Sequence, residues 1–166
     1  AAIILSAEAP AYFFPASPEQ VVNACYAAGF RLVQRGVIGD ELVAAEYLRL
    51  WEDPGWGTMI RSTCPVIVDM VRGRHPELVP YLAPVTSPVA AEARYLRATY
   101  GAEMPIVSAG VCLSEGQGDV EAAITFEQLA ELFVRREVVL EQQQRFFSRI
   151  PEERRRYLST AGGMPV

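Results

Sequence analysis

The sequence predicts one α/β domain over residues 1–166, with a mainly parallel sheet of four or five strands and helices on both of its faces. Three observations support this fold class. Short apolar runs alternate with helix-like stretches, which is typical of βαβ units. Two capping boxes, Ser17 to Gln20 and Thr125 to Gln128, mark helix starts. Of the 166 residues, 51% are hydrophobic, which suits one domain with a sizeable core.

Three strands and three helices are predicted in the first half of the chain. The strands are expected at residues 3–6, 32–37 and 58–62. The helices are expected at residues 18–28, 40–52 and 65–72. Ser17 and Pro18 give the first helix an N-cap and a proline at its first position, and Gly29 stops it. Asp40 is expected to cap the second helix, and Pro65 to begin the third.

Two strands and three helices are predicted in the second half. Ser87 and Pro88 begin a helix that ends near Gly101. The strands are expected at residues 105–111 and 122–124. A charged helix is expected at residues 127–147 and a short one at residues 151–158. The segment SEGQGD, residues 114–119, is expected to form a flexible loop.

Charge and composition exclude several classes of partner. The net charge of -5 gives the chain no attraction to nucleic acid or to an anionic membrane. No run approaches the roughly 20 apolar residues of a membrane span, and the first ten residues lack the basic region of a signal peptide. The three cysteines are too few and too scattered for a disulfide framework, so we expect a cytoplasmic protein. Because the sequence begins without Met and stops at GGMPV, we expect it to be excised from a longer chain.

Two of the cysteines fall just past predicted strands. Cys64 follows the strand at 58–62, and Cys112 follows the strand at 105–111. In a parallel sheet all carboxyl ends lie on one edge, where ligand sites gather, so the two thiols can lie close together. Cys64 also begins a helix, whose free N–H groups and dipole stabilise a thiolate. Buried packing, a reactive thiolate and a metal ligand remain three open interpretations.

The remaining cysteine and the single histidine are weaker candidates. Cys25 shares a helix face with Val21, Val22 and Ala28, so we expect it in the core. His75 is the only histidine, and a Cys–His dyad with Cys64 is an alternative to metal binding.

Five segments in register carry a family resemblance. RSTCPVIVDMVRGRHPELVPYLAPVTSP (61–88) resembles the first cluster-binding segment of iron-only (di-iron) hydrogenases, which reads roughly T-S-C-C-P-x-W, then Y-P-E-L and K-S-P. IVSAGVCLSE (106–115) is similar to the second segment, V-x-x-M-P-C-x-x-K, and DVEAAITFEQLAEL (119–132) to the stretch that follows it. SAEAPA (6–11) stands where the family has A-P-[SA], and STAGGMP (159–165) resembles the family's G-A-T-G-G-V-M. The order is preserved along nearly the whole chain.

The resemblance implies a cofactor and a set of site residues. Cys64 and Cys112 would be two of the four thiolates that hold a cubane 4Fe-4S cluster, in one lobe of the larger family domain. The cofactor-binding residues would be Ala9, Pro10, Ser62, Thr63, Pro65, Ser87 and Glu115. The family's other two ligands come from a C-x-x-x-C segment that nothing here matches. We therefore expect the cluster to be incomplete or absent in this fragment.

Departures from the family pattern argue against hydrogen chemistry. Thr63 stands where the family has a proton-relay cysteine. Glu115 stands where a lysine hydrogen-bonds a cyanide ligand, and the chain contains no lysine at all. Val89 replaces a glutamine and Gly110 a methionine. We assign no catalytic residue and do not expect hydrogen turnover.

The first functional hypothesis is a hydrogenase-like iron–sulfur domain for electron transfer or redox sensing. It would work within a longer bacterial protein, with redox or signalling domains of the same chain as partners. The alternatives are a hydrogenase with a remodelled active site, a non-metal interaction or signalling module, and a relative of the family's eukaryotic cousins in iron–sulfur assembly. We also expect self-association of the fragment, because the missing remainder would leave an apolar face exposed.

Overall fold

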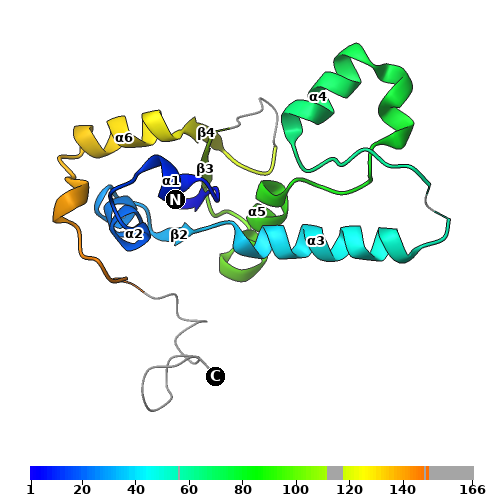
Figure 1. Cartoon of the computed structure of the whole chain (residues 1–166). Coiled ribbons are helices and arrows are strands. Elements are labelled where there is room, and N and C mark those ends of the chain that lie inside the picture. The colour runs from blue at the N-terminus through cyan, green and yellow to red at the C-terminus, as the bar shows by residue number, and fades with distance from the viewer. Residues whose placement is uncertain (56, 112–117, 148, 150–166) are drawn as a thin grey trace.

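The computed structural model describes residues 1–55, 57–111, 118–147 and 149. At its centre lies a four-stranded sheet in the order β2-β1-β3-β4, with every neighbouring pair parallel (Figure 1). The strands are β1 (Ala2–Leu5), β2 (Leu32–Gln34), β3 (Ile106–Gly110) and β4 (Ala122–Thr125). The predicted α/β class and the parallel sheet are confirmed. No helix in the described ranges combines the length and the apolar character that crossing a membrane requires.

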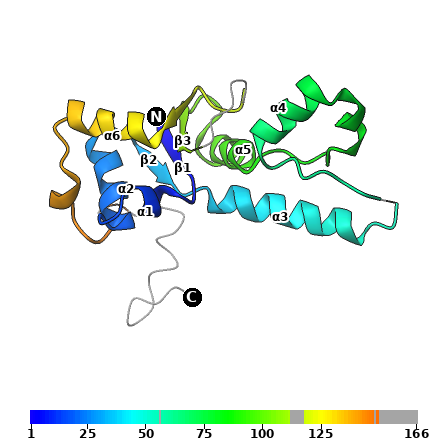
Figure 2. The same cartoon turned by 45° about the horizontal axis from the view of Figure 1, so that its top comes forward.

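Helices cover both faces of the sheet, because side chains along β1 alternate between two hydrophobic clusters. Ile3 and Leu5 pack on the side of α2 (Pro18–Ala27) and α6 (Phe126–Arg135). Ala2 and Ile4 pack on the opposite side, against α5 (Pro88–Tyr100). Figure 2 shows α2 and α6 together at one end of the molecule, with α5 at the other side of the strands.

The helix starts that were predicted from local signals are largely confirmed. In both capping boxes the N-cap side chain accepts from the backbone N–H three residues later, and the glutamine side chain accepts from the N-cap N–H. α4 (Pro65–Arg74) and α5 begin at the expected prolines. A short helix, α1 (Ala9–Tyr12), was not predicted.

The start of α3 (Val37–Glu52) corrects the sequence prediction. Its N-cap is Gly36, with φ of 67°, and Asp40 lies within the helix. The expected cap is not used because the buried Glu92 carboxylate, on α5, accepts a hydrogen bond from the Gly39 N–H. The first turn is therefore satisfied from a different helix. The preceding strand accordingly ends at Gln34, short of the predicted residue 37.

The predicted strand at residues 58–62 is wrong. Ile60 forms only an isolated bridge with Leu82, through hydrogen bonds of 2.7 Å to the Tyr81 carbonyl and 2.9 Å from the Ala83 N–H. A single bridge is too short to count as a strand, and it is not part of the central sheet. Cys64 therefore reaches the sheet edge from a separate loop and not from a sheet strand.

The predicted helix at residues 127–147 is also corrected. α6 ends at Arg135, Glu137 has φ of 55°, and a short 3-10 helix, η2 (Leu140–Gln142), follows. The buried amide of Gln20, on α2, donates to the carbonyls of Leu140, Glu141 and Gln143. These carbonyls bond to a partner far away in sequence instead of continuing a helix. The predicted helix at 151–158 lies outside the described residues.

One part of the chain projects away from the sheet. Beyond its first turns α3 extends outward, and α4 and η1 (Pro76–Tyr81) lie near its far half (Figure 1). We call residues 43–86 the α3–α4 arm and the remaining described residues the sheet body. The cavity described next lies where these two regions meet.

Candidate functional site

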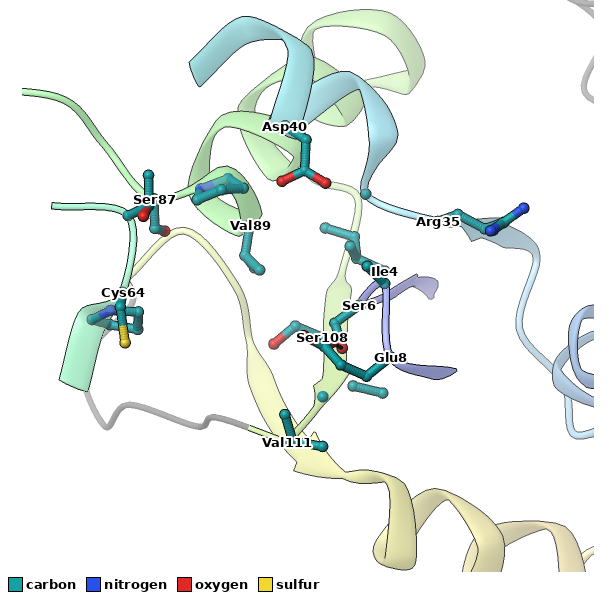
Figure 3. Close-up of a pocket in the computed structure, with 17 residues that line it drawn as sticks. Ile4, Ser6, Glu8, Arg35, Asp40, Cys64, Ser87, Val89, Ser108 and Val111 are labelled. Carbon is teal, nitrogen blue, oxygen red and sulfur yellow. Dashed lines mark hydrogen bonds between the residues drawn. The ribbon is translucent and has the colours of Figure 1, made fainter. Parts of the chain in front are cut away.

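A cavity of about 260 Å³ opens at the carboxyl ends of β1 and β3 (Figure 3). In the sheet, β2 lies on one side of β1 and β3 lies on the other side, so the strand order reverses direction at β1. Such a switch in strand order leaves a crevice at the carboxyl edge, where α/β proteins bind ligands. The residues that line it are Ile4, Ser6, Ala7, Glu8, Arg35, Gly36, Asp40, Thr63, Cys64, Pro65, Ser87, Pro88, Val89, Ser108, Ala109, Gly110 and Val111.

Three helices begin at this cavity. Gly36, Cys64 and Ser87 are the N-cap residues of α3, α4 and α5, and all three line it. Helix N-termini carry partial positive charge, so their convergence favours a negatively charged group. The first turns of α3 and α5 already have side-chain partners. In α3 the Gly39 N–H donates to the Glu92 carboxylate, and in α5 the Ala90 N–H donates to the Ser87 hydroxyl at 3.2 Å. α4 has no such side-chain cap, and its start is the one that carries the thiol.

Carboxylates on the cavity wall limit this positive potential. The Asp40 carboxylate points toward the open space, whereas Arg35 points away from it (Figure 3). Glu8 accepts a hydrogen bond of 2.6 Å from the Ser6 hydroxyl. The wall therefore combines helix dipoles, hydroxyl groups and acidic side chains, and it offers no inward basic side chain among its labelled residues.

The Cys64 thiol is free and half-buried at the cavity rim. Its loop is fixed by Ser62, whose N–H donates to the Tyr47 hydroxyl and whose hydroxyl donates to the Ala83 carbonyl, both at 2.7 Å. Ser62 itself is buried and is not part of the cavity wall, whereas the predicted residues Thr63, Pro65 and Ser87 are. Ser62 is thus placed to position the cysteine.

Two predicted residues stand apart from the cavity, and others were missed. Ala9 and Pro10 belong to α1, while the cavity is lined by Ser6 and Glu8, which follow β1 directly. Asp40 and Ser108 were also missed as site residues. The sequence did contain a signal for Ser6 and Ser108. Both are polar residues in or just after an apolar run that predicts a strand, and the carboxyl ends of such strands form the ligand-binding edge.

Cys112 and Glu115 lie outside the described residues. The neighbouring Val111 is described, and it lines the cavity. The part of the chain that the structure describes contains no group of three or more His, Cys, Asp or Glu side chains able to hold a metal ion. Among the described residues, Cys64 is the one thiol on the cavity wall, so the described lining alone does not supply the ligand set of a cluster.

Burial and position decide the roles of the two weaker candidates, Cys25 and His75. Cys25 is fully buried in the cluster beside α2, and burial raises the pKa of its thiol to about 12. Such a thiol stays protonated and acts as a core residue, as predicted. His75 is the C-cap of α4 and Cys64 its N-cap, so the helix holds the two residues roughly 16 Å apart along its axis. The Cys–His dyad is therefore wrong.

Positions that depart from the hydrogenase pattern gather at the same place. Thr63, Val89 and Gly110 all line the cavity. A side chain at position 110 would lie 3.0 Å from the Ser6 hydroxyl oxygen, so the glycine matches the close approach of the β1 and β3 ends. Three of the four replacements therefore surround one space, while the fourth, Glu115, lies outside the described residues.

Fold and cavity together define a doubly wound α/β domain with a thiol at its ligand-binding edge. The sequence model of the family described as iron only hydrogenase large subunit, C-terminal domain, matches residues 4–164. The chain therefore belongs to this family.

Solved structures support the same fold. An [FeFe]-hydrogenase from work on stepwise H-cluster assembly, HydA(deltaEFG), superposes with a TM-score of 0.65 at 20% identity. The apo form of [FeFe]-hydrogenase HydA1 from Chlamydomonas reinhardtii superposes with a TM-score of 0.60, also at 20% identity. Each match covers 86% of this chain and 44% of the other, so the chain spans less than half the length of these hydrogenases. No curated protein matches.

Proposed function

We propose that this hydrogenase-family domain supplies two thiolates, Cys64 and Cys112, to a four-iron cluster used for electron transfer or redox sensing. The observation that carries the proposal is the position of Cys64. Its accessible thiol lies at the uncapped N-terminus of α4, on a cavity at the switch point of the sheet. A helix N-terminus stabilises a thiolate, which is the form that binds iron.

The two thiolates would come from the two walls of the cavity. Cys64 comes from the start of α4, and Val111 brings the chain to the cavity from the end of β3, one residue before Cys112. Two thiolates are half of the usual four-cysteine shell, so the remaining ligands would come from other parts of the protein. The bound cluster would supply one-electron chemistry. The chain's own contribution is to hold the iron, with Pro65 and Val89 limiting access of water.

Hydrogen turnover is not part of the proposal. Thr63 offers a hydroxyl at the cavity where the family has a proton-relay thiol. A hydroxyl does not ionise near neutral pH, whereas a cysteine thiol can, so Thr63 is a poorer proton carrier. The chain has no lysine to hydrogen-bond an anionic iron ligand.

The test is the iron and acid-labile sulfide content of the full-length protein, prepared without oxygen, with an EPR spectrum after reduction. We expect about four irons per chain and a reduced-cubane signal. Cys64→Ser and Cys112→Ser should each lower the iron content, whereas Cys25→Ala, at a fully buried thiol, should not. Unchanged iron in both cavity variants would refute the ligand assignment. Six irons together with hydrogen uptake would favour a remodelled hydrogenase instead.

A second candidate is a protein-interaction or signalling module without metal. The α3–α4 arm favours it, because Leu48 and Trp51 on α3 and Val66 and Met70 on α4 are exposed to solvent. Exposed apolar groups of this kind are often covered by another domain or protein. Absence of iron from the full-length protein, even after reconstitution, would support this candidate. We further propose redox or signalling domains of the same chain as partners, a cytoplasmic location, and self-association of the isolated fragment.

A further inference from the structure

Helix α3 carries apolar residues on two opposite faces. Its buried residues are Gly39, Val43 and Leu50, and Gly39 packs directly against α5. On the other side of the helix, Leu48 and Trp51 are exposed, in the half that projects beyond the sheet (Figures 1 and 2). A surface helix normally turns polar residues outward, and a helix that is apolar all round is normally covered all round.

The exposed apolar residues of α3 follow helical spacing. Ala44, Leu48 and Trp51 are separated by four and three residues, which places them on one face of the helix. Val37, seven residues before Ala44, extends this face to the first turn. We call these four residues the outer stripe. At 1.5 Å per residue the stripe is about 21 Å long, and a stripe of this shape fits a second helix packed along it.

Two carboxylates lie on the same face as the outer stripe. Glu41 is seven residues before Leu48, and Glu52 is four residues after it. Both are exposed, and neither forms an ion pair within the described part of the chain. The one arginine of α3, Arg49, is already paired with Glu46 at 2.6 Å. The face therefore combines apolar surface with negative charge that α3 itself does not neutralise.

This negative charge selects among the possible occupants of the face. In a symmetric dimer the same patch of both copies meets, so the two sets of carboxylates would repel each other. An anionic membrane and nucleic acid are disfavoured for the same reason. A surface that carries both apolar and basic side chains gains from burial of the stripe and from charge complementarity.

We propose that the outer stripe docks an amphipathic helix of a partner protein. The apolar side chains of that helix cover Leu48 and Trp51, and its Lys or Arg side chains pair with Glu41 and Glu52. Trp51 is the expected anchor, because tryptophan is enriched among the residues that dominate binding energy. The inference does not rest on a bound cluster, since none of these residues lines the cavity.

The test measures binding of synthetic peptides to the full-length protein by fluorescence anisotropy. Two labelled amphipathic helices, each long enough to span the stripe, carry leucine along one face. One has Lys beside the leucines, and the other has Glu at the same positions. We expect the Lys peptide to bind, and to bind more weakly as the salt concentration rises. The Glu peptide should bind roughly tenfold more weakly or worse, because its charges meet like charges.

Substitutions in the face and matched controls elsewhere locate the binding. Leu48→Ser and Trp51→Ser should each weaken binding of the Lys peptide roughly tenfold or more. Val134→Ser, at an exposed apolar residue of α6, should leave it unchanged. Glu41→Lys should shift the preference toward the Glu peptide, whereas Glu103→Lys, the same change at an exposed position after α5, should not. A gained preference does not arise from misfolding, so Glu41→Lys keeps the test decisive if an apolar variant unfolds.

Several outcomes would overturn the inference. Equal binding of the two peptides would remove the role of charge, and full binding by Leu48→Ser and Trp51→Ser would remove the stripe. Failure of the full-length protein to bind either peptide would mean that the rest of the chain covers the face or that it takes no helix. Dimerisation in analytical ultracentrifugation that Trp51→Ser abolishes would make a second copy the occupant. Iron content should be the same in all variants, which keeps this test separate from that of the cluster.

Discussion

The sheet body and the α3–α4 arm bury their apolar residues to very different extents. All of β1 and β2 is buried, and two hydrophobic clusters fill the faces of the sheet. In the arm, Val71 is the one buried residue of α4, while Leu48 is 65% exposed and Trp51 84% exposed. The body is thus a conventional packed core, whereas the arm presents apolar side chains to solvent.

The two regions differ in how they are held in place, although both contribute residues to the site. The sheet of the body is covered on both faces and buries two hydrophobic clusters, which stabilises the fold. The arm depends on a few anchors, among them Leu50 and the hydrogen bonds of Ser62. The cavity lies at their boundary, because Ser6 and Ser108 come from the body and Thr63 and Cys64 from the arm. A ligand that contacts both walls would therefore also hold the arm in place.

The largest effect is expected from a change in the core of the body. Phe126 is almost fully buried, and its ring centroid lies 5.6 Å from that of Phe13. Phe126→Ala should lower the free energy of unfolding by about 3–5 kcal/mol, because it leaves a large cavity. Trp51→Ala, in the arm, should change it by less than about 0.5 kcal/mol. Urea unfolding followed by circular dichroism measures both, and equal losses would contradict the contrast between the two regions.

A smaller effect is expected where α3 crosses α5. A methyl group at Gly39 would collide with the Pro88 carbonyl oxygen and press on Glu92. Gly39→Ala should therefore destabilise the protein by about 1–3 kcal/mol, through overpacking.

Gly73 in α4 is the matched control, because nothing lies within 4 Å of its added methyl group. Gly73→Ala should stabilise the protein by about 0.5–1 kcal/mol, since alanine favours a helix. Thermal unfolding measures both variants. If Gly39→Ala and Gly73→Ala shift the unfolding midpoint in the same direction, α3 does not pack closely on α5 at Gly39.

The smallest effect is expected from a surface carboxylate. The Ile106 N–H donates to Glu121, and this bond, supported by Arg97, lowers the pKa of the Glu121 carboxyl below its ordinary value. A lowered pKa in the folded state means that the interaction contributes fully above the unfolded value and is lost as the pH falls through the folded value.

Glu121→Gln should therefore flatten the loss of stability below about pH 4.5 and cost only a few tenths of a kcal/mol at neutral pH, because the side chain is half exposed. Urea unfolding at pH 3 to 7 measures this. An identical pH profile in the variant and the parent would rule out the contribution.

Local signals predicted the parts of the fold that depend on neighbouring residues. The capping boxes at Ser17 and Thr125 satisfy helix N–H groups within a single turn, so their outcome does not depend on tertiary structure. The alternation of strands and helices likewise indicated a parallel sheet, because parallel neighbours need crossover connections. The expected helix start directly after Cys64 is confirmed, since Cys64 is the N-cap of α4.

Distant partners decided the features that were predicted wrongly. The segment at 58–62 has a strand-like composition, but only Leu82 pairs with it, through Ile60. The polar stretch after Arg135 was compatible with a longer helix, yet Gln20 and Asn23 on α2 take up its carbonyls. Propensity cannot reveal such bonds, because they join residues more than 100 positions apart.

The sequence by itself determined the α/β class, most helix starts and the family resemblance, because these depend on local order along the chain. Only the tertiary structure decided that Ser6, Glu8, Asp40 and Ser108 share one cavity with that thiol. The reason is physical: burial and hydrogen bonding of a side chain depend on the elements that pack around it, and these come from distant parts of the chain.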